Sequence, residues 1–408
     1  MAKNEVVAAI DVGTTKVCSI IANVGYGDGL QVLGVGVTPT RGLHKGLVVN
    51  IPEAKQSIRQ SVKKAEQASG LKMDSAYVGV TGRHISSLNT RGVVAISRSD
   101  RLVRPDDLKR VLQAARTVAL PSDRKLLHVI PRSYALDGQV GVKNPVNMHG
   151  FRLDVETHVI TAAVASVQNL VKCIRGVGID IEDLVLEPLA SGEAVLRPDE
   201  MEAGVILADI GGGTTDVAVF REGSIWHTAI LPVAGYQITR DIAIGLGLPF
   251  EVAEEIKKRY GGVMPTHNGK EEEPATLKTE NGYSVSYRDL NAIIRARVEE
   301  ILELIALEIP GSDHVKEFPC GLVLTGGSSN LMGIETLGQQ VLRLPVRIGV
   351  PSGVYGIADI LPDPAYATSV GLLLWGTRRQ EGEQSWQTRG VGETFRRFFF
   401  RLRRTFSR

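Results

Sequence analysis

The feature that most constrains this chain is a short turn pattern that occurs in both of its halves. It reads Asp11-Val-Gly-Thr-Thr-Lys16 in the first half and Asp209-Ile-Gly-Gly-Gly-Thr-Thr-Asp216 in the second. Each copy follows a short apolar run and precedes a β-rich run, so each is predicted to form strand, Gly-Thr turn and strand. The repetition predicts two halves that clasp one nucleotide between them.

The residue types of the two turns suit a phosphate group. Glycine lets the backbone approach closely, successive N–H groups point at the phosphate oxygens, and threonine hydroxyls add donors. The leading aspartates can hold hydrated Mg²⁺ through water. The predicted cofactor-binding residues of the turns are Asp11, Gly13, Thr14, Thr15, Lys16, Gly211, Gly212, Gly213, Thr214 and Thr215, and the predicted metal residues are Asp11 and Asp209.

Other nucleotide and catalytic patterns are missing from the sequence. It contains no Gly-x-x-x-x-Gly-Lys-Ser/Thr loop, no Gly-x-Ser-x-Gly and no histidine pair at metal-ligand spacing. A single Asp-x-Gly-Thr-Thr would as readily be an ordinary β-turn, but two copies argue against that alternative.

Three further segments add candidates for a nucleotide site. The Gly326-Gly327-Ser328 turn follows a strand and could contact adenosine, although an ordinary strand–helix turn is the alternative. Glu254 and Lys257 lie one helical turn apart and could offer a ribose acceptor and an amine, or form an exposed ion pair. Glu187, at a strand end before a helix, could orient an attacking water, or be a solvated or capping glutamate.

Length and composition predict an ordinary globular chain with several domains. The 408 residues suffice for two to four domains, and 43% hydrophobic with 23% charged residues is typical of globular proteins. Cys18, Cys173 and Cys320 are predicted to be reduced core thiols. With no signal peptide and no spanning apolar run, we expect a cytoplasmic chain that does not cross a membrane.

The pattern along the chain predicts an α/β fold of two duplicated lobes with mixed sheets flanked by helices. A helix is predicted from Pro52 to Gly70, and an α+β insertion with short strands at 92–97 and 127–134 and a helix between Pro105 and Pro121. The predicted domains are a first lobe (1–83 and 162–198), an inserted α+β subdomain (84–161), a second lobe (199–240 and 306–376), a helical subdomain (241–305), a flexible linker (377–391) and a C-terminal amphipathic helix (392–408).

The last 17 residues differ from the rest of the chain in charge. They contain six arginines and one glutamate, a net +5, so the remainder carries −3 of the overall +2. The apolar residues form one helical stripe, which favours insertion into the headgroup boundary of an anionic membrane over a nucleic-acid-binding tail. The predicted membrane residues are Phe395, Phe398, Phe399, Leu402, Phe406, Arg396, Arg397, Arg401 and Arg404.

With these segments in order, the chain resembles the actin, sugar-kinase and heat-shock chaperone ATPase superfamily. Within it the sequence is similar to the FtsA family of bacterial cell division proteins over nearly its whole length. The phrases that carry this similarity are Lys45–Ile51, Leu127–Pro131, Asp183–Ser191 and Asp209–Asp216. The resemblance implies an actin-like ATPase fold with the insertion at 84–161.

The resemblance also implies ATP and Mg²⁺ between the lobes, self-association into actin-like protofilaments, and a scaffold with at most weak ATPase activity. It implies binding of the C-terminal peptide of FtsZ to the helical subdomain and recruitment of later division proteins through residues 84–161. From the regular helical stripe of the tail and the linker before it we expect no nucleic-acid partner. The protein would then anchor the Z ring to the cytoplasmic side of the plasma membrane at the division site. Glu187 occupies the place of a water-positioning glutamate in chaperone-type relatives.

Arg288, Asn291 and Arg295 are the predicted contacts for the acidic FtsZ peptide, because their spacing places them on one helix face. A solvated polar face is the alternative for that row. Two other functions remain open at this point, a PilM-like cytoplasmic adaptor of pilus assembly and a sugar-kinase-type phosphotransferase. The phosphotransferase would need a catalytic aspartate that faces an acceptor pocket, and the sequence identifies none.

Overall fold

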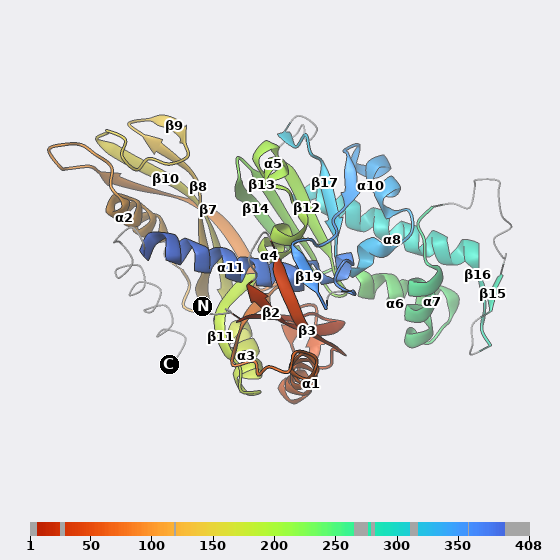
Figure 1. The fold of residues 1–408 in the computed structure, drawn as a ribbon. Coiled ribbons are helices and arrows are strands. Elements are labelled where there is room, and N and C mark those ends of the chain that lie inside the picture. Colours follow the sequence, from red (N-terminus) through yellow and green to blue (C-terminus); the bar gives the residue numbers. More distant parts are fainter. Residues whose placement is uncertain are drawn as a thin grey trace.

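Two mixed β-sheets flanked by helices make up the two halves of the molecule, and a third sheet projects from them (Figure 1). The structure is a computed structural model that describes residues 6–24, 29–117, 120–264, 276–278, 282–310, 317–357 and 359–387, the last nine by their backbone alone. The predicted membrane helix, 392–408, lies outside the described residues, as do 388–391 of the predicted linker.

The sheet of the first half has six strands. They are β1 (Val6–Val12), β2 (Lys16–Val24), β3 (Leu30–Pro39), β6 (Ser75–Val80), β11 (Asp180–Leu186) and β19 (Val354–Gly356), in the order β11-β6-β1-β2-β3-β19. β1, β2 and β3 form an antiparallel meander, and the other three strands join in parallel. The short ladder of β4 (Leu43–His44) and β5 (Leu47–Val48) follows β3.

Helices cover both faces of this sheet. One face packs against α1 (Ile51–Ser69) and α3 (Val164–Arg175), and the other against α4 (Glu187–Val195) and α11 (Ala367–Gln387). The predicted helix between Pro52 and Gly70 is confirmed as α1. Its first turn is capped by Asn50, whose Oδ1 accepts the Glu53 N–H at 3.3 Å, and Gly70 ends it with φ 72°.

The second half repeats the plan of the first. Its strands are β12 (Val205–Ile210), β13 (Thr215–Arg221), β14 (Ser224–Leu231), β17 (Leu322–Thr325) and β18 (Val346–Ile348), in the order β14-β13-β12-β17-β18. The meander β12-β13-β14 has β17 parallel to its first strand, as β1-β2-β3 has β6. The predicted duplication is therefore confirmed in the strand topology.

Short helices and a helical region complete the second half. They are α5 (Pro198–Ala203), α6 (Gly235–Leu246), α7 (Phe250–Tyr260), α8 (Tyr287–Leu307), η1 (Gly327–Asn330), α10 (Ile334–Leu342) and η2 (Pro364–Tyr366), with a small ladder of β15 (Thr276–Lys278) and β16 (Ser284–Ser286). α6, α7 and α8 extend away from the sheet (Figure 1) but share one hydrophobic core with it.

The inserted part is a four-stranded antiparallel sheet with one helix against it. It comprises β7 (Ile85–Ala95), α2 (Pro105–Arg116), β8 (Arg124–Leu136), β9 (Gln139–Val142) and β10 (Arg152–Ala163), in the order β7-β10-β8-β9. The helix after Pro105 is confirmed, whereas the strands are much longer than predicted. On β10, buried polar residues such as Thr157 and His158 break the apolar alternation that indicates a strand, and the β8–β10 pairing contains two register shifts.

The inserted sheet contacts the second half along β14. The Ser87 hydroxyl donates to Thr228 O at 3.0 Å, and the Ser224 hydroxyl donates to Pro131 O at 2.8 Å. The Arg132 guanidinium also lies 3.9 Å from the centre of the Trp226 ring. The insertion therefore interrupts the first half in sequence but contacts the second half in the structure.

α4 and α11 cross at very close range. A Cβ built on Gly371 would lie 1.7 Å from Ala190 O, so the crossing requires glycine at this position. α11 continues to Gln387, which corrects the predicted linker for residues 377–387. These residues contain no proline and are rich in Arg, Gln and Glu, which propagate a helix. Among the described residues, no helix is long and apolar enough to cross a membrane.

Candidate functional site

The tips of the two predicted hairpins meet. A Cβ built on Gly212 would lie 2.3 Å from Thr15 Cγ2, and one built on Gly213 would lie 2.5 Å from Thr14 Oγ1. Side chains at either glycine would push the tips apart. The turns β1–β2 and β12–β13, far apart in sequence, are thus brought together at one place between the halves.

Several of the predicted phosphate contacts serve the turns themselves. The Gly211 N–H donates to Thr214 O at 2.9 Å, and the buried Thr215 hydroxyl donates to Val233 O at 2.7 Å. These groups are therefore already used within the second half, which corrects their assignment to phosphate. Thr14 Oγ1 accepts the Gly46 N–H at 3.1 Å and can still donate its own proton. Thr15 is exposed at its tip, and Thr214 is buried at the other.

Lys16 projects from the first hairpin toward the segment before α11. Its ammonium group donates to Ala365 O and lies 4.8 Å from the centre of the Tyr366 ring. This contact joins β2 to η2, so the first hairpin is tied to the segment that leads into the last helix.

The carboxyl groups of the two hairpins are buried close to one another. Asp11, Asp209 and Asp216 are 6%, 9% and 2% exposed. Burial raises the pKa of Asp209 to about 6, opposed by the Thr368 hydroxyl. Burial and the Asp209 charge raise the pKa of Asp216 to about 8. The pKa of Asp11 is also raised by burial, against the effects of Lys16 and Ser369.

Glu187 belongs to the same group of acids. It is the first residue of α4, and burial followed by the charges of Asp11, Asp216 and Asp209 raises its pKa well above the ordinary value. Lys16 is the cation that opposes this effect. Glu187 is half-buried and its carboxyl group lies among like charges, which argues against the solvated-glutamate alternative.

These residues fit a hydrated magnesium ion. Asp216 Oδ1 is buried without a hydrogen-bond partner in the described part of the chain, and the acids outnumber the nearby cation Lys16. Within that part no three His, Cys, Asp or Glu side chains converge closely enough to chelate a metal directly. Mg²⁺ gives up its water shell reluctantly, so contact through water suits this arrangement. The metal roles of Asp11 and Asp209 stay predictions.

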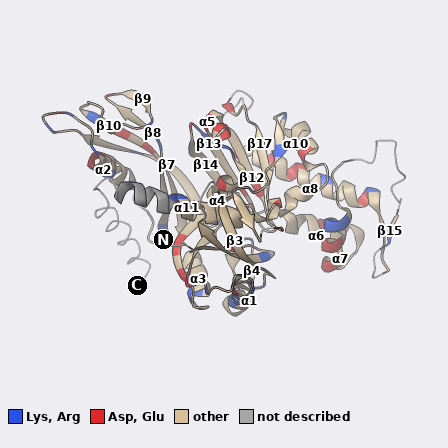
Figure 2. Ribbon diagram, viewed as in Figure 1, with Lys and Arg blue, Asp and Glu red and all other residues tan. Residues whose placement is uncertain are grey.

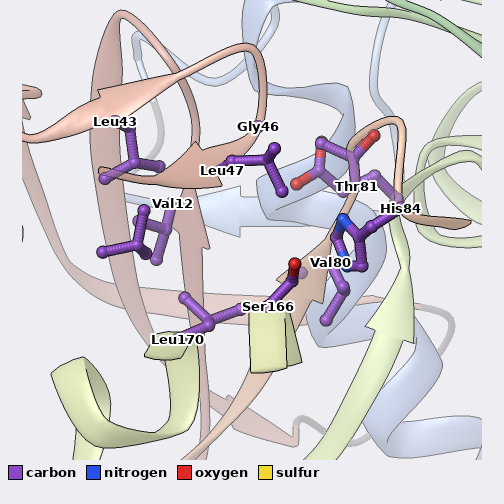
Figure 3. A pocket seen from close by; sticks show the side chains of 12 residues that line it. Val12, Leu43, Gly46, Leu47, Val80, Thr81, His84, Ser166 and Leu170 are labelled. Carbon is purple, nitrogen blue, oxygen red and sulfur yellow. The ribbon is translucent and has the colours of Figure 1, made fainter. Parts of the chain in front are cut away.

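Beside Glu187 lies a cavity of about 20 Å³ (Figure 3). Its lining is Val12, Leu43, Gly46, Leu47, Val48, Gly79, Val80, Thr81, His84, Ser166, Leu170 and Glu187. Both ring nitrogens of His84 are buried without a partner among the described residues, and burial lowers the His84 pKa to about 4. A cavity of this size has room for a water molecule but not for a nucleotide base.

The predicted adenosine turn adjoins the second hairpin. Gly326 has φ 84°, and a Cβ there would lie 2.3 Å from Asp209 Oδ1, so glycine is needed for both conformation and space. The Ser328 hydroxyl donates to Gly211 O at 2.9 Å. The turn therefore lies against the phosphate hairpin, as expected for one continuous site.

Glu254 and Lys257 lie beside the same hairpin. Lys257 Nζ contacts Glu254 Oε2 at 2.7 Å and donates to Gly235 O at 3.2 Å, and its side chain is 11% exposed. Gly235 in turn donates its N–H to Gly211 O at 3.1 Å. The alternative of an exposed ion pair is therefore correct in part. Glu254 and Lys257 do form an ion pair, but the pair is largely buried beside the hairpin.

The row proposed for an acidic peptide is not a single exposed face. Arg288 is exposed, and Arg295 is half-buried and pairs with Glu299 at 2.8 Å. Asn291 is 7% exposed, and its Oδ1 accepts the Gly262 N–H at 3.0 Å. The assignment of Asn291 to peptide binding is therefore wrong, because its amide holds a loop of the same subdomain.

Two residues beside the aspartates, Thr368 and Ser369, were not predicted from the sequence. The Thr368 hydroxyl donates to Asp209 Oδ2 at 3.0 Å, and the Ser369 hydroxyl donates to Asp11 Oδ2 at 2.7 Å. The signal that could have found them is a pair of hydroxyl residues that directly precedes the apolar run of the last helix.

Solved structures with the same arrangement of two halves define the class. The chain resembles a PilM–PilN type IV pilus biogenesis complex (TM-score 0.63, 18% identity, 91% of this chain and 98% of the other). It also resembles MreB5 of Spiroplasma citri bound to AMPPNP (TM-score 0.56, 14% identity, 94% and 99%). Together with the paired hairpins, these similarities establish the actin-like ATPase fold.

The sequence comparisons narrow the class to one family. Residues 206–371 match the model for cell division protein FtsA, and residues 82–161 match the SHS2 domain inserted in FtsA. Curated FtsA proteins are 42% identical in Pseudomonas aeruginosa (95% of this chain, 93% of the relative) and 34% identical in Escherichia coli K12 (98% of each). The chain belongs to the FtsA family of cell division proteins.

Proposed function

We propose that this chain binds ATP with Mg²⁺ between its two halves, self-associates, and anchors FtsZ polymers to the cytoplasmic face of the plasma membrane. The observation that carries the nucleotide part is the meeting of the two hairpin tips, whose strands carry three buried aspartates with the half-buried Glu187 close to them. Family membership favours this cell-division function over the pilus-adaptor and phosphotransferase alternatives.

In the proposed nucleotide site both halves contact the phosphates, and the second half contacts adenosine. Thr14, Thr15 and the backbone of Gly212 and Gly213 lie at the tips, where phosphate oxygens would find donors. Gly326, Gly327, Ser328, Glu254 and Lys257 form the wall that would contact adenosine. Bound Mg²⁺ supplies positive charge that offsets the phosphates, and Asp11 and Asp209 would hold it through water. The solved MreB5 relative bound to AMPPNP supports a nucleotide in this fold.

Glu187 supports a switch more than a strong ATPase. Burial and the charges of Asp11, Asp216 and Asp209 raise its pKa well above the ordinary value, which disfavours the charged carboxylate that would accept a proton from an attacking water. We therefore propose that the nucleotide controls lobe closure and assembly, with at most weak turnover.

The membrane part of the proposal rests on residues 392–408. In the described body, Lys and Arg are interspersed with Asp and Glu (Figure 2), whereas these last residues combine six arginines with a helical stripe of phenylalanine and leucine. α11 leads toward this segment along the inserted sheet, where the Trp375 ring contacts His128 of β8 at 5.8 Å between centroids. The later division proteins would meet the insertion, residues 84–161, near the same membrane surface.

The FtsZ part of the proposal assigns the acidic C-terminal peptide to the helical subdomain, residues 241–305. Arg288 and Arg295 of α8 remain the residues proposed for it. A pull-down with the FtsZ C-terminal peptide is the test, because it separates this function from that of a pilus adaptor. Arg288→Glu and Arg295→Glu should each weaken capture about tenfold or more, since a charge-assisted contact becomes a repulsive one.

A matched control keeps the charge change but moves it to the first half. Arg59→Glu alters an exposed arginine on α1 and should leave peptide capture unchanged. If the unmodified chain does not retain the peptide, the proposed FtsZ partner is wrong. Equal losses in all three variants would show that net charge, and not this face of α8, governs capture.

A further inference from the structure

Thr368 and Ser369 join the aspartates of both halves to one helix. They are the second and third residues of α11, and the two aspartates that accept their hydroxyl protons, Asp209 and Asp11, come from different hairpins. Thr368 is 7% exposed and Ser369 is fully buried. One turn of helix thus contacts both leading carboxylates at the same time.

The segment before α11 fixes this turn in place. Pro364 O accepts the Gly326 N–H at 3.1 Å, which ties η2 to the second half. Ala365 O accepts from the Lys16 ammonium group, which ties η2 to the first half. The segment that leads into α11 is therefore held by both halves, before the hydroxyl groups of α11 itself are considered.

Helix formation alone does not explain hydroxyl residues at these two positions. Ser and Thr inside a helix are neutral to unfavourable, because their hydroxyls compete for backbone groups. Here both hydroxyls donate away from the helix to buried carboxylate oxygens. A valine and an alanine would fill the same space, so the observed residues indicate a role for the hydroxyl protons.

The hydrogen bonds select one oxygen of each carboxylate. Both hydroxyls donate to the Oδ2 atom of their aspartate, and the Oδ1 atom of each aspartate faces a glycine turn. Asp11 Oδ1 lies 3.9 Å from a Cβ built on Gly13. Asp209 Oδ1 lies 2.3 Å from a Cβ built on Gly326. The rotation of both carboxylates about their side-chain bonds is thereby fixed. Carboxylates that serve a metal are commonly held by such outer hydrogen bonds.

We propose that Thr368 and Ser369 are positioning residues that orient Asp209 and Asp11 for the hydrated magnesium ion of the nucleotide. The inference rests on the proposed Mg-ATP site and adds two residues and their role to it. In this proposal the first turn of α11 positions one aspartate from each half around the same cation.

The test is calorimetric titration of ATP into the full chain over a series of Mg²⁺ concentrations, with Thr368→Val and Ser369→Ala. Loss of an outer hydrogen bond to a metal carboxylate typically weakens metal affinity about 10- to 100-fold. We expect each variant to need about 10- to 100-fold more Mg²⁺ to reach half of the increase in ATP affinity that saturating Mg²⁺ gives. The affinity for ATP in EDTA should be unchanged. Thr368→Ser and Ser369→Thr keep the hydroxyl and should restore the Mg²⁺ requirement.

The matched control is Thr377→Val on the same helix, where the hydroxyl donates only to Leu374 O at 2.9 Å. It should leave the Mg²⁺ requirement unchanged. A shift of less than about twofold in both Thr368→Val and Ser369→Ala would overturn the positioning role, as would an equal loss of affinity with and without Mg²⁺. If Thr368→Val does not fold, Ser369→Ala and the two conservative variants decide the question. Failure of the unmodified chain to bind ATP would instead overturn the proposed nucleotide site, and this inference with it.

Discussion

Among single residues, His158 shows most directly how the inserted sheet is joined to the second half. It lies on β10 and is 1% exposed. Its Nδ1 donates to Asn89 Oδ1 at 2.7 Å, so Nε2 accepts from the Thr228 hydroxyl of β14 at 3.0 Å. Burial, with His227 and Arg132 nearby, lowers the His158 pKa to about 4. The neutral ring is thus part of the junction.

This pKa predicts a loss of stability in acid. The folded pKa of about 4 lies below the ordinary value of 6.5, so the unfolded state binds more protons between these pH values. Stability therefore falls as the pH drops through this window, by about 2 kcal/mol from pH 7.5 to pH 5. His158→Gln removes the titrating group, so the variant should lose about that much less on acidification. Urea unfolding at the two pH values measures the difference.

His84 has a similarly lowered pKa, but it titrates in the unmodified chain and in His158→Gln alike. Its contribution therefore cancels when the losses of stability of the two proteins are compared. Parallel losses in the unmodified chain and in His158→Gln would contradict a neutral His158 at the junction. They would assign the acid sensitivity to His84 and to other groups.

At the residue scale the sequence predicts what local chemistry requires. Gly212, Gly213 and Thr14 were predicted because a phosphate turn needs those residue types in that order, and the structure places them where the hairpin tips meet. Their contact with phosphate stays a prediction. Thr368 could not be predicted, because its partner Asp209 is 159 positions away, and only the fold brings the two together. Asn291 was assigned wrongly for the same reason, since helix spacing does not show that its amide oxygen accepts from Gly262, 29 positions away.

Among the elements, α4 and α11 cross at very close range although they are far apart in sequence. Gly371 allows this crossing, because a Cβ would lie 1.7 Å from Ala190 O. Farther along α11, the Arg378 guanidinium pairs with Glu193 of α4 at 2.5 Å, and Trp375 Nε1 donates to Asp183 Oδ2 at 3.3 Å. The helix is therefore fixed at several points between the nucleotide site and its own later turns.

Gly371→Ala should destabilise the protein. Alanine is normally better in a helix than glycine by about 1 kcal/mol, but here the added methyl meets a backbone oxygen that no rotamer can move away. We expect a net loss of about 1 to 3 kcal/mol, the usual cost of overpacking. The apparent midpoint of thermal unfolding, measured without nucleotide, reports this loss.

The matched variant is Gly245→Ala in α6, where the nearest atom, 2.7 Å from the built Cβ, is the end of the Ile293 side chain. That atom can rotate away, so the midpoint should stay the same or rise. A stabilised Gly371→Ala would mean that the α4–α11 crossing is looser than described.

Elements were predicted well where periodicity and capping agree. α1 combines Pro52 near its start, Gly70 after its end and an amphipathic face, and its limits were predicted closely. The strands of the insertion were underestimated, because Thr157 and His158 put polar groups where a core strand normally carries apolar ones. The last helix was predicted too short, because its later turns are polar in sequence and lack the apolar stripe that indicates a packed helix.

For the whole molecule, three of the contacts that join the halves in the described part of the chain matter most here. The hairpin tips meet in the centre, α4 and α11 cross beside them, and the inserted sheet reaches β14 through His158 and Ser87. A nucleotide between the tips would act on all three, because each depends on the relative position of the halves. This arrangement favours the proposed role of ATP as a switch for assembly.

The proposed membrane attachment is a property of the whole molecule as well. Each basic residue near an anionic surface contributes about 1 kcal/mol, and phenylalanines that enter the lipid boundary would add to this, so a single tail would hold one chain reversibly. Assembly of many chains would strengthen attachment without any new contact, because the tails of one filament bind together. Attachment and polymerisation should therefore depend on each other.

Deletion of residues 392–408 should abolish sedimentation of the full protein with anionic liposomes. Phe398→Ser combined with Phe399→Ser is the sharper variant, because it keeps all six arginines and removes the centre of the apolar stripe. We expect it to lose most of the binding at physiological salt, where surface charges are screened beyond about 8 Å. If the double variant binds liposomes as well as the unmodified chain, the arginines alone are sufficient and the amphipathic helix is wrong. If the deleted protein still sediments, attachment lies elsewhere in the chain and the tether is wrong.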